Sequence, residues 1–172
     1  MSVMIREATL ADAENIARIH VATWQHAYRG QMPDALLDSL SVERRLAWCK
    51  QVLSEPAPKS HSLIAVDGEV ILGFCDVGAN REESAGETEG ELYAIYVAPP
   101  AIGTGVGSAL IDEGVCLLRA EGFTHATLWV LASNATARRF YEHKGWSADG
   151  VNKTEYWNDV PLYELRYSIS LS

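Results

Sequence analysis

Three glycines at alternate positions stand between a strand-like segment and an apolar helical pattern, in the sequence PPAIGTGVGS (99–108). Gly103, Gly105 and Gly107 each cost the folded chain conformational entropy, and an ordinary surface turn needs only one or two such residues. A loop that runs from a strand into a helix presents unpaired backbone N–H groups at the positive end of the helix dipole. The spacing therefore predicts a site where a phosphate or pyrophosphate lies against the main chain.

Two familiar phosphate-binding loops do not fit this segment. A Walker loop ends in Gly-Lys-Ser/Thr, whereas Gly107-Ser108 has no such lysine. A dinucleotide fingerprint needs an acidic residue at the end of the next strand, and ATLWVLASN (126–134) ends without one. From the loop alone, the remaining alternative is a glycine-rich turn that binds nothing.

Length, charge and composition narrow the class of protein. A chain of 172 residues suffices for one buried core, so a single domain over 1–172 is expected. The net charge of −9 opposes binding to nucleic acid and favours a cationic substrate. No apolar run is long enough to span a membrane, and the acidic N-terminal segment does not resemble a secretion signal, so a cytoplasmic location is expected. The cysteines and histidines have no metal-type spacing, and no metal is predicted.

The periodicity of apolar residues predicts the elements that position the glycine loop. Helices are expected at 10–28, about 34–53, 107–118 and 134–144. Strands are expected at 3–9, 62–66, 70–77, 91–97 and 161–170, and the segment 122–133 is expected to form a turn and another strand. In the strand before the loop, alternation places Glu91, Tyr93, Ile95 and Val97 on one face and Leu92, Ala94 and Tyr96 on the other. The polar segment 80–91 is expected to be a solvated loop whose glutamates could attract a cationic amine, and the order of elements predicts a mixed α/β sheet.

Two segments together carry a resemblance to a known family. ELYAIYVAPPAIGTGVGSALI (91–111) and NATARRFYEHKGW (134–146) closely resemble two motifs of the GNAT superfamily of acyl-CoA-dependent N-acyltransferases, and the element order agrees over nearly the whole chain. The resemblance implies an α/β fold with a mixed, mostly antiparallel central sheet, a parallel pair of strands at the cofactor site and about four flanking helices. Ile102 stands where the family pattern has Gln or Arg, so the backbone N–H groups from Gly103 to Ser108 would hold the phosphates without that side-chain contact.

The resemblance also implies the residues of the cofactor site. The main chain of Ile95, Tyr96 and Val97 would pair with the pantetheine arm of coenzyme A. The other implied cofactor-binding residues are Gly103, Thr104, Gly105, Val106, Gly107, Ser108, Asn134 and Tyr141. Asn134 is at the same time an ordinary helix N-cap, and both roles can hold together.

Acyl transfer from a thioester to an amine needs a neutral amine, donors for the oxyanion and a proton for the departing thiolate. Tyr141 matches the family tyrosine that acts as the general acid; the alternative is an aromatic pair, Phe140 and Tyr141, that only packs the helix on the sheet. Glu91 matches the position of a glutamate base in several family members, and the alternative is a strand-end glutamate that faces solvent. Tyr93 with ordered water is the next candidate for the base.

The acceptor site implied by the resemblance includes Trp24 and Tyr28, one helical turn apart, and Tyr93; an aromatic pair at this spacing is also typical of a core. The predicted activity is acetyl transfer from acetyl-CoA, the co-substrate, to a primary amine of a small molecule or peptide by direct attack in a ternary complex. A sensor that binds acyl-CoA without turnover and a nucleotide-binding protein are the alternatives. Partners other than the amine are not expected among nucleic acids or membranes, and a homodimer is an assembly that family members often form.

Overall fold

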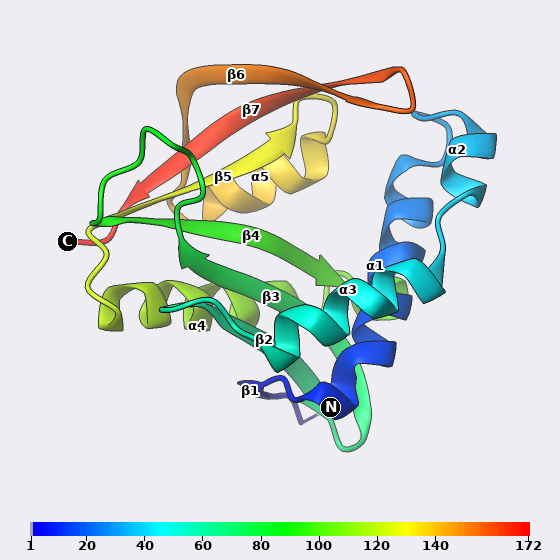
Figure 1. Ribbon diagram of the computed structural model, residues 1–172, viewed down its shortest axis with the longest axis horizontal. Helices are drawn as coiled ribbons and strands as arrows, with labels where there is room; N and C mark the ends of the chain where they lie inside the picture. Colours follow the sequence, from blue (N-terminus) through cyan, green and yellow to red (C-terminus); the bar gives the residue numbers. More distant parts are fainter. Residues whose placement is uncertain (1) are drawn as a thin grey trace.

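A seven-stranded sheet forms the centre of the computed structural model, which describes residues 2–172 (Figure 1). Met1, where the predicted domain begins, lies outside the described residues. The strands are β1 (Met4–Glu7), β2 (His61–Asp67), β3 (Val70–Ala79), β4 (Glu89–Val97), β5 (His125–Leu131), β6 (Ser147–Trp157) and β7 (Val160–Ser170). The α-helices are α1 (Ala13–Tyr28), α2 (Asp34–Asp38), α3 (Val42–Ser54), α4 (Val106–Ala120) and α5 (Ala135–His143), and two 3₁₀ turns are η1 (Leu10–Asp12) and η2 (Pro99–Ala101).

The sheet is mixed, as the sequence predicts. Its strand order is β1-β2-β3-β4-β5-β7-β6. Every neighbouring pair is antiparallel except β4 and β5, which are parallel. The crossover between these two strands is α4, which directly follows the glycine loop.

Helices cover both faces of the sheet, and two successive residues of β3 show which helices cover which face. Phe74 packs in a cluster with residues of α1 and α3, while Cys75 packs in a cluster with residues of α4 and α5. Figure 1 shows α1, α2 and α3 gathered at the right and α4 at the lower left. Gly114 lets α4 approach closely, because an added Cβ there would lie 3.1 Å from Val77 Cγ1 and 3.3 Å from Cys75 Sγ. No helix within residues 2–172 combines the length and apolar character that crossing a membrane requires.

The single helix predicted over about 34–53 is wrong, because the chain forms α2 and α3 there. Ser39 follows α2, and its hydroxyl donates to the carbonyl of Leu36 at 2.6 Å. Ser41 is the N-cap of α3, and its hydroxyl accepts from the amide of Arg44 at 3.2 Å. Serine side chains compete with helical backbone bonds in this way and favour ends over interiors. The split explains why the described residues contain five α-helices where about four are predicted.

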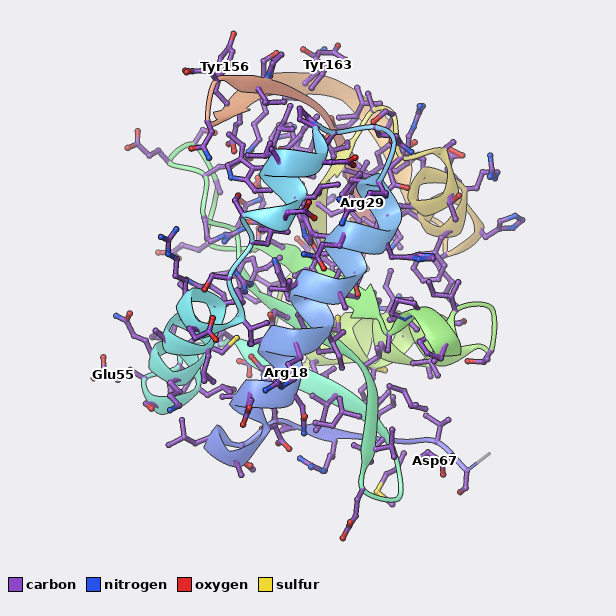
Figure 2. The ribbon with its side chains drawn as sticks, turned by 90° about the vertical axis from the view of Figure 1, so that its right-hand side faces the viewer. Arg18, Arg29, Glu55, Asp67, Tyr156 and Tyr163 are labelled. Carbon is purple, nitrogen blue, oxygen red and sulfur yellow. The ribbon has the colours of Figure 1, made fainter. Side chains whose placement is uncertain are left out.

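The strand β6 is absent from the sequence prediction. It lies at the edge of the sheet and is exposed along most of its length, so it lacks the apolar alternation that marks a half-buried strand. Figure 2 shows Tyr156 and Tyr163, one on each strand of the β6–β7 hairpin, at the end of the molecule opposite Asp67. The solvated loop predicted over 80–91 is also too long, since β4 begins at Glu89.

His61 joins β1 to the end of α4 through two carboxylates. Its Nδ1 lies 2.6 Å from Glu7 Oε1, and its Nε2 lies 2.8 Å from Glu121 Oε1. Burial disfavours the charged imidazolium, but the hydrogen bonds to both carboxylates outweigh burial and raise the pKa of His61 above 6.5. A raised folded-state pKa stabilises the fold below the unfolded pKa, and this contribution is lost as pH rises through the folded value.

His61→Gln is therefore expected to lower the melting temperature more at about pH 6 than at about pH 9, with a loss of about 1 kcal/mol at the lower pH. Thermal unfolding at the two pH values measures the difference. His125→Gln is the control, because His125 is exposed and its ring has a hydrogen bond only with the hydroxyl of Thr124 among the described residues. An equal loss for His61→Gln at both pH values would show that the paired carboxylates do not hold a charged ring.

Candidate functional site

A cavity of about 1350 Å³ opens where β4 and β5 separate. The two strands pair only at their beginnings, and the last pair is Glu91 with Thr127. Beyond this point β4 remains paired with β3, while β5 remains paired with β7. Within residues 2–172, the main-chain groups of the segment Ile95–Val97 that point away from β3 therefore have no strand partner. An extended ligand can use these free groups as a neighbouring strand would.

A β-bulge at Tyr93 accompanies this separation. Asp76 of β3 pairs with Ala94, but the next residue, Val77, pairs with Leu92, which leaves Tyr93 as the extra residue. A bulge bends its strand and reverses the alternation of side chains beyond it. The predicted faces of this strand are consequently wrong: Leu92 packs in the α4 cluster with Ile95 and Val97, not with Ala94 and Tyr96.

The glycine loop lies at one end of the cavity. Gly103 and Gly105 have φ angles of +81° and +90°, and Gly105 is the N-cap of α4. Within residues 2–172, no backbone carbonyl accepts a hydrogen bond from the amides of Gly103, Gly105 or residues 106–108. These free donors at the positive end of a 15-residue helix form an anion-binding arrangement. The Ile102 side chain is 51% exposed beside them.

A cation lies at the same helix start. The Lys144 ammonium, which follows α5, donates to the Ser108 hydroxyl at 2.9 Å and pairs with Asp112 Oδ1 at 2.7 Å. Ser108 lines the cavity. Sequence reasoning did not find this lysine, because 36 residues separate it from Ser108 and only the packing of α5 beside α4 brings them together.

Tyr141 lines the middle of the cavity. It is buried, its ring lies against Phe140 and Tyr167, and its hydroxyl has no hydrogen-bond partner within the described residues. Burial, together with the neighbouring side chains, raises the pKa of this phenol well above its ordinary value of 10. The phenol is therefore protonated at neutral pH. The Tyr141 ring packs in the core cluster, as the second alternative predicts, and the residue also lines the cavity; its role as general acid stays a prediction.

Asn134 and the aromatic pair of α1 meet at the next part of the cavity wall. The Asn134 side chain accepts from the amide of Ala137 at 3.1 Å as the N-cap of α5, and it donates to the Tyr28 hydroxyl at 3.1 Å. The Trp24 indole donates to the Tyr96 hydroxyl at 3.0 Å, and the Trp24 and Tyr28 rings lie 4.9 Å apart. Trp24 and Tyr28 line the cavity and also pack in a hydrophobic cluster with Leu37.

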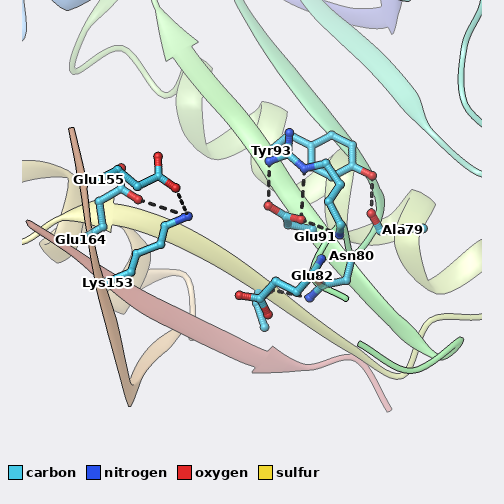
Figure 3. Close-up of polar contacts among 10 residues, drawn as sticks. Ala79, Asn80, Glu82, Glu91, Tyr93, Lys153, Glu155 and Glu164 are labelled. Atoms are coloured by element: carbon cyan, nitrogen blue, oxygen red, sulfur yellow. Dashed lines mark hydrogen bonds and ion pairs between the residues drawn. The ribbon is translucent and has the colours of Figure 1, made fainter. Parts of the chain in front are cut away.

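Glu91 does not face solvent, because it is only 3% exposed. Arg81 holds both of its oxygens: the Arg81 amide and Nε donate to Oε1 at 3.0 and 3.3 Å, and Nη2 donates to Oε2 at 2.8 Å (Figure 3). The Arg81 guanidinium also stacks on the Tyr93 ring at 4.2 Å, while the Tyr93 hydroxyl donates to the carbonyl of Ala79. The carboxylate predicted to act as a base is thus already ion-paired.

A second charged cluster lies across from Glu91, on the β6–β7 hairpin (Figure 3). Lys153 lies 2.8 Å from Glu155 and 3.6 Å from Glu164, and its ammonium stacks 4.2 Å from the centre of the Trp129 ring. The carboxylates that line the cavity outnumber the cations that line it. They are Glu82, Glu91, Glu155 and Glu164 against Arg81 and Lys153. This excess of negative charge favours a cationic ligand at this end.

The structure brings most of the predicted site residues around one cavity. Those that line it are Trp24, Tyr28, Glu91, Tyr93, Ile95, Tyr96, Val97, Gly103, Gly105, Gly107, Ser108, Asn134 and Tyr141. Thr104 and Val106 do not line it: the Thr104 hydroxyl bonds back to the carbonyl of Ala101, and the Val106 side chain is buried in the core. Among residues 2–172, no three or more His, Cys, Asp or Glu side chains form a group that could hold a metal ion.

Comparisons with known proteins point in one direction. The model of the acetyltransferase (GNAT) family matches residues 14–146. The uncharacterized N-acetyltransferase YuaI of Bacillus subtilis (strain 168) is 34% identical over 137 residues, which cover 77% of this chain and 73% of that protein. A mycothiol acetyltransferase of Streptomyces griseus is 37% identical over 141 residues, but these cover 82% of this chain and only 41% of that protein, so the chain spans less than half its length.

Solved structures show the same fold. The PaiA N-acetyltransferase of Thermoplasma acidophilum, solved in complex with coenzyme A, superposes with a TM-score of 0.76 at 18% identity and with 99% of each chain covered. The putative acetyltransferase YncA of Salmonella typhimurium, solved with acetyl-CoA, gives a TM-score of 0.73 at 21% identity, with 100% of this chain and 95% of that chain covered.

Proposed function

The chain belongs to the acetyltransferase (GNAT) family, and from that premise we propose that it transfers an acetyl group from acetyl-CoA to a primary amine by direct attack in a ternary complex. The observation that carries this proposal is that β4 and β5 separate. The cavity between them is continuous from the free amides at the start of α4 to its acidic end. The amine belongs to a small molecule or peptide, and the acidic lining favours one that is cationic. The homodimer and the cytoplasmic location stay predictions from the sequence.

The residues at the donor end fit coenzyme A. The amides of Gly103, Gly105 and residues 106–108 are free to receive a diphosphate, and the Ser108 hydroxyl and Lys144 ammonium lie beside them. Lys144 supplies a cation at a site where Ile102 supplies none. The free main-chain groups of Ile95–Val97 are placed to pair with a pantetheine arm. Acetyl-CoA contributes an activated thioester when bound.

Tyr141 is the general acid of this proposal. Its hydroxyl is protonated and has no partner within the described residues, and the residue lines the cavity, so the hydroxyl is available to give a proton to a sulfur atom that leaves as thiolate. The base role predicted for Glu91 is disfavoured by its ion pair, since both oxygens accept hydrogen bonds from Arg81, which lowers their tendency to take a proton.

The test is incubation with acetyl-CoA and a panel of putrescine, lysine, kanamycin and an alanyl peptide, with detection of free thiol. We expect thiol release with at least one amine and none when all amines are omitted. Tight coenzyme A binding without transfer to any amine would instead support an acyl-CoA sensor. Thermal stabilisation by ATP or NAD but not by coenzyme A would contradict both and support a nucleotide-binding protein.

A further inference from the structure

One carboxylate in the cavity differs from the others in its partners. Arg81 holds both oxygens of Glu91, Arg166 lies 3.0 Å from Glu82, and Lys153 lies 2.8 Å from Glu155. For Glu164, the only ion-pair or hydrogen-bond partner within the described residues is the same Lys153 ammonium, at 3.6 Å. The Glu164 side chain is 19% exposed, against 58% for Glu155. Glu164 is thus a half-buried carboxylate with oxygens open to a ligand.

Glu164 also lies near the residues assigned to the chemistry. It pairs in β7 with Leu131, the last residue of β5, three positions before Asn134. Burial, and to a smaller extent the charge of Glu164, raises the pKa of Tyr28, whose hydroxyl accepts from Asn134. Tyr28 is in turn among the neighbours of Tyr141 in the cavity. All three side chains line the same cavity.

The surroundings of Glu164 suit a proton acceptor. Burial raises its pKa above 4.5; the Lys153 ammonium from β6 opposes this shift, and the Glu155 carboxylate from β6 adds to it. Tyr28 of α1 faces it as a neutral phenol. A carboxylate with a raised pKa is a stronger base than an ordinary one, and the Lys153 ammonium at 3.6 Å favours the ionised form that can take a proton.

We propose that Glu164 is the catalytic residue that takes a proton from the acceptor ammonium, an inference that rests on the proposed function. The ammonium gives one proton to a Glu164 oxygen, and the neutral amine forms the new N–C bond at the thioester carbonyl carbon. The C–S bond breaks and the sulfur takes the proton of Tyr141, which regains one from the second N–H of the same nitrogen. Glu164, which is partly exposed, then passes its proton to water, so that each turnover releases one proton.

The experiment compares two nucleophiles in the Glu164→Gln variant of the full chain. One is the panel amine with the highest turnover, which is protonated at neutral pH and needs a base. The other is hydroxylamine, which is already neutral there and needs none. We expect kcat/KM at neutral pH to fall about 100-fold with the alkylamine and less than about threefold with hydroxylamine. The alkylamine loss is expected to shrink near pH 10, where the ammonium loses its proton to solvent without help.

Asp149→Asn is the matched control, because it removes a carboxylate of similar exposure, 20% against 19%, from the same hairpin at a position that does not line the cavity; it is expected to change both nucleophiles by less than about threefold. Equal losses with both nucleophiles in Glu164→Gln would assign Glu164 a structural role and overturn the proposal. A loss confined to the alkylamine in Glu91→Gln, with none in Glu164→Gln, would overturn it in favour of Glu91. If the unaltered protein transfers acetyl to neither nucleophile, the proposed function fails and this inference fails with it.

Discussion

Tyr141→Phe is expected to lower kcat about 100-fold while the Kd for coenzyme A changes less than about threefold. Phenylalanine keeps the buried ring that packs against Phe140 and Tyr167 and removes only the hydroxyl. Because that hydroxyl is protonated and has no hydrogen bond within the described residues, its loss leaves no buried partner unsatisfied. The effect should therefore appear in the chemical step and not in folding or cofactor binding.

Steady-state kinetics and calorimetric titration with coenzyme A separate these two quantities. Tyr163→Phe is the matched control, since it removes a tyrosine hydroxyl from an exposed position on the β6–β7 hairpin (Figure 2). A Tyr141→Phe variant that turns over at the unaltered rate would exclude the phenol as the proton donor. A parallel fall in kcat and cofactor affinity would mean that Tyr141 acts by shaping the cavity.

Gly105→Val is expected to do the reverse, with coenzyme A affinity at least about tenfold weaker and little change in kcat at saturation. Gly105 has a φ of +90°, a conformation that a β-branched residue adopts only under strain. Open space surrounds the position of an added Cβ, so the protein itself does not oppose the side chain. The variant relieves the strain by turning the α4 start, which moves the free amides away from the diphosphate.

The control variant needs the same backbone strain at a position outside the cavity. Gly68, in the turn between β2 and β3, has a φ of +61° and equally open surroundings, so Gly68→Val costs stability without touching the α4 start. Calorimetric titration and melting of both variants, side by side, distinguish the two effects. If Gly68→Val weakens coenzyme A binding as much as Gly105→Val does, general destabilisation explains the result and the glycine loop loses its assigned role.

Local features of the site could be predicted from the sequence. The glycine loop, the strand before it and the Asn134–Tyr141 helix each lie within one short segment, and their residue types alone favour a turn, a cap and an apolar face. The parallel pairing of β4 and β5 follows from the helix between them, because a parallel pair needs a crossover of this length.

The rest depends on contacts between distant segments. The bulge at Tyr93 arises from the register between β3 and β4, and no residue type within the strand marks it. Lys153, Glu155 and Glu164 enter the cavity from a hairpin whose first strand is exposed and lacks apolar alternation. From the sequence, Glu91 is an acidic residue at the end of a predicted loop. The ion pair between Arg81 and the Glu91 carboxylate forms only when that loop is folded.

Because β4 and β5 separate, different segments of the chain form the two ends of the cavity. In the proposed function, the thioester end is formed by segments between β4 and α5, whereas the amine end also takes residues from α1, the loop after β3 and the β6–β7 hairpin. Substitutions in α1, in the loop after β3 or in the hairpin are therefore expected to alter which amine is accepted without changing the residues proposed to bind the acyl donor. Among the described strands, the edge strand β6 pairs with β7 alone. Substitutions in β6 are therefore expected to disturb the remaining sheet less than substitutions in the other strands of the cavity wall.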